Sequence, residues 1–159
     1  YYRWLKVQPY YAFAASAEAG EWMDAARGLV EYFDVLDARH HPGAAPEGRP
    51  QRVREALRAA QVPALSKLLQ FLEHRSDIHL RGPARAAERA ATVAFVPRWV
   101  EPQELGAHLA RRGFMIGFGG FYAVRLLQTM NVDPVRGIAR ISFVHYMTCA
   151  EVEGLTEAL

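Results

Sequence analysis

The chain has 159 residues, of which 51% are hydrophobic, so it is long enough and apolar enough for one folded domain with a core. Its net charge is only +2 and it has no apolar run of membrane-spanning length, so neither nucleic acid nor a membrane is an expected partner. The single cysteine, Cys149, excludes an internal disulfide and a cysteine-based zinc site, and a reducing cytoplasm is the expected location.

Two long helices are predicted in the first half of the chain. Apolar residues recur at three- and four-residue spacing over residues 20–39, and the Pro-Gly pair after His41 ends that helix. Residues 42–50 are rich in proline and glycine, and this composition predicts an exposed loop. A second helix is expected over residues 49–74, with a bend possible at Pro63.

The second half alternates between short strands and helices. Strands are predicted at residues 78–80, 92–97, 114–118 and 138–144. Helices are predicted at residues 101–112, 121–130 and 148–159. The last helix begins with a capping box, because Thr148 is followed three residues later by Glu151. The fold class expected is α+β: a small antiparallel or mixed sheet with helices packed on one face, preceded by two long helices.

Five segments of this second half resemble one enzyme family. They are residues 89–95 (Arg-Ala-Ala-Thr-Val-Ala-Phe), the helix and glycine of residues 101–113, residues 119–123 (Gly-Gly-Phe-Tyr-Ala), residues 137–142 (Gly-Ile-Ala-Arg-Ile-Ser), and residues 145–152 (His-Tyr-Met-Thr-Cys-Ala-Glu-Val). In order and spacing they resemble the small C-terminal domain of class V aminotransferases and cysteine desulfurases, which are fold-type I enzymes that use pyridoxal phosphate. A weaker resemblance extends upstream through the two long helices.

The resemblance gives Arg140 the role of binding the α-carboxylate of an amino-acid substrate. A guanidinium fork matches a carboxylate with two parallel hydrogen bonds, which a lysine cannot do. The competing interpretation is an arginine at a strand edge in a surface ion pair. The motif around Arg140 favours the substrate role, and it is the one site residue predicted.

The groups that hold the cofactor in such enzymes are not expected in this chain. The cofactor is held there by a lysine of the large domain, and the only lysines here are Lys6 and Lys67. Both are expected to be solvated or to extend along an apolar surface. The nearest match to the family's phosphate-contacting Gly-Thr is Gly20-Glu21, where a glutamate would repel a phosphate. No catalytic residue, cofactor ligand or metal ligand is therefore assigned.

The resemblance to cysteine desulfurases is incomplete. Their persulfide cysteine would fall near Tyr122. Cys149 lies instead in the first turn of the last helix, where a thiol pKa can be lowered, although a small semi-buried helix residue is the simpler interpretation. The aromatic residues near the N-terminus, Trp4 among them, are expected to form either an interface or part of a core.

The overall expectation is the C-terminal part of a pyridoxal-phosphate enzyme acting on an amino acid, inactive alone. Residues 1–41 would belong to a large domain or lead from it. Residues 42–76 would form a loop and a long connecting helix, and residues 77–159 would form the small domain. The large cofactor-binding domain would lie on the same or a separate chain, and the whole enzyme would be a homodimer. The reaction type is left open among transamination, β- or γ-elimination and epimerisation. The alternative is a non-catalytic, stand-alone small-domain module for binding or assembly.

Overall fold

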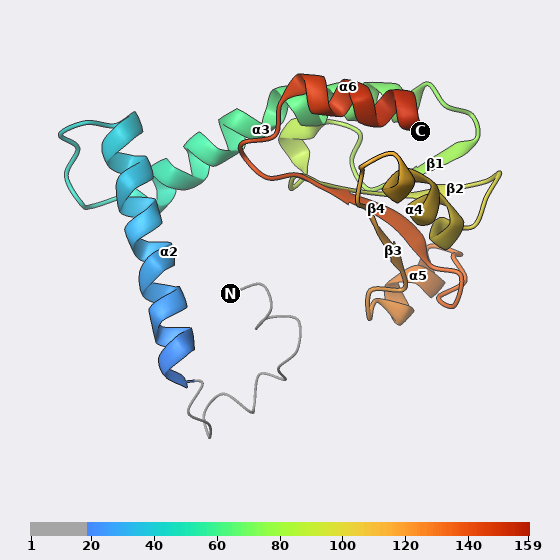
Figure 1. Ribbon diagram of the computed structural model, residues 1–159, viewed down its shortest axis with the longest axis horizontal. Helices are drawn as coiled ribbons and strands as arrows, with labels where there is room; N and C mark the ends of the chain where they lie inside the picture. Colours follow the sequence, from blue (N-terminus) through green and yellow to red (C-terminus); the bar gives the residue numbers. More distant parts are fainter. Residues whose placement is uncertain (1–18) are drawn as a thin grey trace. The chain divides into compact units, whose positions relative to one another are not determined.

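The computed structural model describes residues 19–159 of the chain (Figure 1). Its elements in order are α2 (Ala19–His40), α3 (Arg49–Glu73), β1 (Ile78–Arg81), the 3₁₀ turn η2 (Ala86–Glu88), β2 (Thr92–Pro97), α4 (Pro102–Arg111), β3 (Gly117–Gly119), α5 (Val124–Thr129), β4 (Ile138–Ser142) and α6 (Cys149–Ala158). The described chain divides into two compact units, one that ends at Ala56 and one that comprises residues 57–159. The expected α+β class is confirmed.

Within the first unit, a buried carboxylate joins α2 to the start of α3. Asp37 is only 4% exposed. Arg52 Nε donates to its Oδ1 at 2.8 Å and Arg52 Nη2 donates to its Oδ2. His41 Nδ1 lies 3.2 Å from Oδ1. The hydrogen bonds from Arg52 are the main reason that the pKa of Asp37 lies below its usual value. The carboxylate is therefore paired, as a buried charge must be, and it fixes the helical hairpin.

The second unit is built on a four-stranded antiparallel sheet with the order β1-β2-β4-β3. One face of the sheet carries Val93 and Phe95 from β2 and Ala139 and Ile141 from β4, all in the main buried cluster. The side chains between them point to the opposite face, because successive residues of a strand alternate. That opposite face is covered in part by α5, whose Leu127 packs in a smaller cluster.

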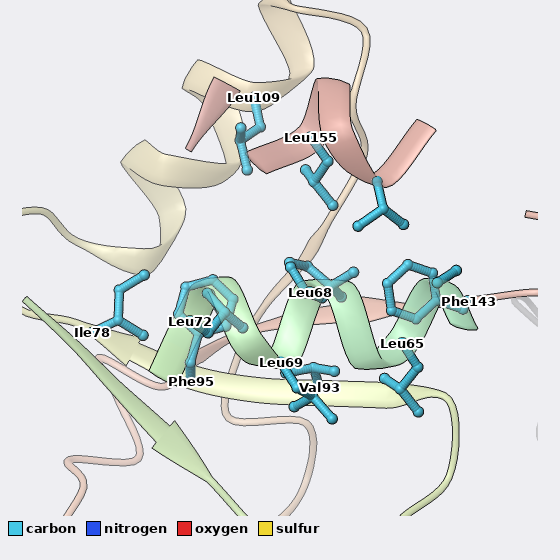
Figure 2. Close-up of a cluster of buried hydrophobic side chains, with 14 of the residues drawn as sticks. Leu65, Leu68, Leu69, Leu72, Ile78, Val93, Phe95, Leu109, Phe143 and Leu155 are labelled. Carbon is cyan, nitrogen blue, oxygen red and sulfur yellow. The ribbon is translucent and has the colours of Figure 1, made fainter. Parts of the chain in front are cut away.

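Helices α3, α4 and α6 cover the first face of the sheet. Figure 2 shows leucines of α3 lying along β2, with residues from α4 and α6 closing the same cluster. Among the fully buried side chains are Leu65, Leu68 and Leu72 of α3, Phe95 of β2 and Leu109 of α4. Each such leucine stabilises the fold by roughly 1.5–3 kcal/mol relative to full exposure. This core holds the sheet rigid, and the sheet in turn positions the opposite face.

The structure shifts some of the predicted boundaries. Helix α3 continues through Pro63, and both Pro63 and Ala59, whose carbonyl loses its donor, are exposed residues. Helix α5 begins at Val124 and not at residue 121, because Phe121 and Tyr122 have φ values of +50° and +58°, which no α-helix accommodates. Strand β3 comprises only Gly117–Gly119, so it is shorter than the predicted strand 114–118 and begins three residues later.

The capping box of α6 is present as predicted and carries a testable pH dependence. The backbone N–H of Glu151 donates to Thr148 Oγ1 at 3.2 Å, and the backbone N–H of Thr148 donates to Glu151 Oε2 at 2.7 Å. The bond from the Thr148 backbone, more than the one from its hydroxyl, lowers the pKa of Glu151 from its ordinary value of 4.5. A depressed carboxylate pKa means that this contribution is present above that value and is lost as the pH falls through the lowered pKa.

Replacing Thr148 with alanine is therefore expected to cost about 1 kcal/mol of unfolding free energy at pH 7, and less in acid. Urea unfolding at pH 7 and again at a pH below the pKa of Glu151 measures both effects. Thr156→Ala, in the same helix but away from its N-terminus, is the control. Equal losses for Thr148→Ala at both pH values would show that Glu151 does not complete the cap.

Candidate functional site

Arg140 lies in the middle of β4, on the sheet face opposite the main core. Its cross-strand partners are Ala94 on β2 and Gly117 on β3. A methyl group on one side and a hydrogen on the other leave room beside its long side chain. Side chains alternate along β4, since Ala139 and Ile141 are in the main cluster while Ile138 packs in the smaller one.

An aromatic ring holds the Arg140 guanidinium. The guanidinium carbon lies 4.0 Å from the ring centroid of Phe121, well within the range of a cation–π contact. The ring rests against Gly117, where a Cβ atom would come within 3.1 Å of two ring carbons. Phe121 is held there by a loop in which it and Tyr122 have left-handed backbone conformations. Backbone strain of this kind persists only where the surroundings fix it.

The guanidinium of Arg140 has no acceptor among the described residues. Its Nε atom is buried and makes no hydrogen bond. Other arginines of the same unit differ: both carboxylate oxygens of Glu101 accept from Arg136 Nε, at 3.0 and 2.9 Å, and Asp77 accepts from Arg75. A buried donor without an acceptor costs about 1–3 kcal/mol. The surface ion pair considered as the competing interpretation is not formed within the described chain.

This arrangement suits the binding of a carboxylate. The ring of Phe121 covers one face of the guanidinium, and a guanidinium donates its hydrogen bonds in its own plane, along its edge. Stacking therefore orients Arg140 without using its donors. The other candidates do not join it: the side chain of Tyr122 is fully exposed, and Cys149 is exposed in the first turn of α6.

Lys67 forms an ion pair that does not involve Arg140 or its neighbours. Its ammonium pairs with Glu153 of α6, and this hydrogen bond is the main reason that its pKa is raised. Lys6, Trp4 and the other aromatic residues near the N-terminus lie outside the described residues, as does the side chain of Glu21 in the Gly20-Glu21 pair. Within the described range no three metal-ligating side chains cluster, and no helix is long and apolar enough to cross a membrane.

Comparison with known proteins now identifies the family. Residues 54–155 match the family model described as aminotransferase class V. The chain belongs to the class V aminotransferase family. No protein among the curated sequences matches it. The matched segment runs from within α3 to within α6 and so includes the whole sheet with Arg140.

Solved structures similar to this chain are cysteine desulfurases and relatives. The cysteine desulfurase CsdA of Escherichia coli is 22% identical with a TM-score of 0.56, over 67% of this chain and 25% of its own. The cysteine desulfurase of Thermococcus onnurineus is 18% identical with a TM-score of 0.60, over 69% and 26%. A NifS-like protein of Rickettsia africae is 16% identical with a TM-score of 0.53, over 69% and 29%. At these identities the likeness shows the fold. The chain matches about a quarter of the length of these structures.

The family implies pyridoxal phosphate in the full enzyme, but the described residues do not fit that cofactor. Attachment needs a lysine that can lose its proton, and the ammonium of Lys67 is held by Glu153 with a raised pKa. The segment that matches the family model thus has no described lysine suited to hold the cofactor.

The sequence predicts Arg140 as a site residue but does not predict the residues that surround it. Phe121 was expected to begin a helix. Ala94 and Gly117 have no functional group that would indicate a binding site. The glycine-rich segment before Phe121 is the only local sign of an unusual loop. The pairing of β4 with both neighbouring strands is what makes these small residues part of the site.

Proposed function

We propose that this chain is the C-terminal part of a pyridoxal-phosphate-dependent enzyme acting on an amino acid, and that Arg140 binds the α-carboxylate of the substrate. The observation that carries the proposal is the guanidinium of Arg140, stacked on Phe121 with a buried Nε atom that has no acceptor. Class V membership supports the cofactor and substrate class. A substrate carboxylate would supply the missing acceptor.

In this mechanism the described chain binds and orients and does not carry the reaction. Arg140 would fix the α-carboxylate through two parallel hydrogen bonds, which also fixes the direction of the bonds at the α-carbon. Phe121 would keep the guanidinium in position when no substrate is bound. Pyridoxal phosphate would supply the electron sink for the reaction from a separate domain. Closure of the small domain over that domain would exclude water.

The domain roles are part of the proposal. Residues 77–159 would be the small domain, residues 42–76 the connection, and residues 1–41 a part of the large domain or a lead from it. The large domain would lie on the same or a separate chain, and the whole enzyme would be a cytoplasmic homodimer. Sequencing the coding region upstream tests this: an in-frame large domain supports the proposal, whereas a stop codon directly before the chain supports a stand-alone module.

Incubation with pyridoxal phosphate tests whether the chain alone holds the cofactor. After borohydride reduction and peptide mapping, we expect no stoichiometric adduct on Lys67, because Glu153 keeps its ammonium paired and protonated. The variant Lys67→Arg is the control, since it retains the charge and removes the amine. A stoichiometric adduct that disappears in Lys67→Arg would contradict the assignment of the cofactor lysine to another domain.

A further inference from the structure

A second arginine, Arg81, also has a buried Nε atom that makes no hydrogen bond. Four described side chains have a buried nitrogen without a hydrogen bond: His41, Arg49, Arg81 and Arg140. The first two still lie near a carboxylate, because His41 Nδ1 is 3.2 Å and Arg49 Nε is 3.5 Å from oxygens of Asp37. Arg81 and Arg140 make no ion pair with any described residue. These two guanidinium groups are thus partly buried, and no described carboxylate balances their positive charges.

The strand register places Arg81 and Arg140 on the same face of the sheet. Arg81 on β1 pairs with Ala94 on β2, and Ala94 pairs with Arg140 on β4. Directly paired residues of neighbouring strands point to the same side, so the three form one row across the sheet. Two strand spacings separate the arginine backbones by about 10 Å. On the sheet, Ala94 lies between them, and it also packs against the smaller apolar cluster.

One neighbouring row of this face is largely apolar, since Val96 and Ile138 lie in the smaller cluster with Leu127 of α5, while its edge on β1 carries a histidine. His79 lies two residues before Arg81 on the same face of β1. Its pKa is lowered by desolvation and then by the positive charges of Arg81 and Arg98. The other neighbouring row holds two hydroxyls, since Thr92 pairs with Ser142 and their oxygens are 3.4 Å apart. No described carboxylate balances the two guanidinium groups in the row.

We propose that Arg81 is a second anion-binding residue and that the ligand of this face is an amino acid whose side chain carries an acidic group. This rests on the proposed function: the α-carboxylate binds Arg140, and the side-chain acid binds Arg81. One carboxylate would satisfy only one of the two buried donors, whereas a ligand with two acidic groups would supply an acceptor to each of the two arginines, on either side of Ala94. Charge-assisted hydrogen bonds to both groups would discriminate strongly against a neutral side chain.

The test compares L-glutamate with L-glutamine, which have nearly the same shape and differ in the second acidic group. Arginine Nε–Hε signals of the 159-residue chain are followed by NMR during each titration. We expect glutamate to shift the signals of both Arg81 and Arg140 and to bind about tenfold more tightly, whereas glutamine shifts Arg140 alone. A tenfold preference corresponds to about 1.4 kcal/mol, within the range of one hydrogen bond to a charged group.

Variants separate this inference from the proposed function. Arg81→Gln is expected to abolish the preference for glutamate and to leave glutamine affinity unchanged, and Arg111→Gln, an exposed control on α4, is expected to change neither. Equal affinities for the two ligands in the wild-type chain, or an Arg81 signal that glutamate does not move, would overturn the role of Arg81. If neither ligand moves the Arg140 signal, the proposed function itself fails.

Discussion

Replacing Arg140 with lysine is expected to weaken binding of L-alanine by about 10- to 100-fold. Lysine keeps the positive charge but loses the planar fork, so one of the two parallel hydrogen bonds to the carboxylate is lost. A hydrogen bond to a charged group contributes about 1.5–3 kcal/mol, and about 1.4 kcal/mol corresponds to a factor of ten. Lysine also loses the flat stacking surface that lies 4.0 Å from the ring centroid of Phe121. Backbone amide shifts of β3 and β4 during a titration measure the affinity.

The control for this substitution is Arg125→Lys, an exposed arginine on α5 that forms no ion pair with a described residue. It is expected to leave the affinity within twofold of the wild type. Urea unfolding should show that both variants are folded. Wild-type affinity in the Arg140→Lys chain would mean that the carboxylate binds elsewhere.

Replacing Leu68 with alanine is expected to lower the free energy of unfolding by about 2–5 kcal/mol. Leu68 is 0% exposed and lies in the cluster where α3 packs on the sheet (Figure 2). Truncation removes apolar contacts and leaves a cavity that neighbours such as Phe95 and Leu155 cannot fill without moving. Urea denaturation followed by circular dichroism measures the change. Since this cluster supports the sheet, the loss should appear in one cooperative transition of the second unit.

Leu126→Ala makes the same chemical change at a residue that is 59% exposed on α5. Its effect is expected to stay within about 0.5 kcal/mol, as for most surface substitutions. If the two substitutions had equal effects, α3 would not be packed on the sheet as described.

Local patterns in the sequence were enough to predict most elements of the fold. β2 has the predicted bounds because Thr-Val-Ala-Phe-Val is β-branched and apolar and ends at a proline. The capping box locates the start of α6 through contacts only three residues apart. The predicted start of α5 was wrong because Phe121 and Tyr122 have left-handed backbone conformations, and the packing of the Phe121 ring against Arg140 and Gly117 cannot be read from the helical pattern of residues 121–130.

In the candidate site too, local sequence patterns predict some residues, whereas others depend on contacts between distant parts of the chain. Arg140 was predicted from the motif around it, which is local. Arg81, which we propose as a second binding residue, was not predicted, because its relation to Arg140 requires two strand pairings between residues far apart in the chain. The missing acceptors of both arginines also depend on where every carboxylate of the unit lies. Glu101, for example, pairs with Arg136, and Glu153 with Lys67.

The most direct test of the central claim is whether Arg140 recognises a carboxylate. The Arg140 Nε–Hε signal of the 159-residue chain is followed during titration with L-alanine and, separately, with L-alaninamide. L-Alaninamide keeps the amine and the methyl group but has no carboxylate. The account predicts a saturable shift with L-alanine and none with L-alaninamide. Equal shifts with both compounds, or no shift with either, would contradict the assignment of Arg140 as the carboxylate-binding residue.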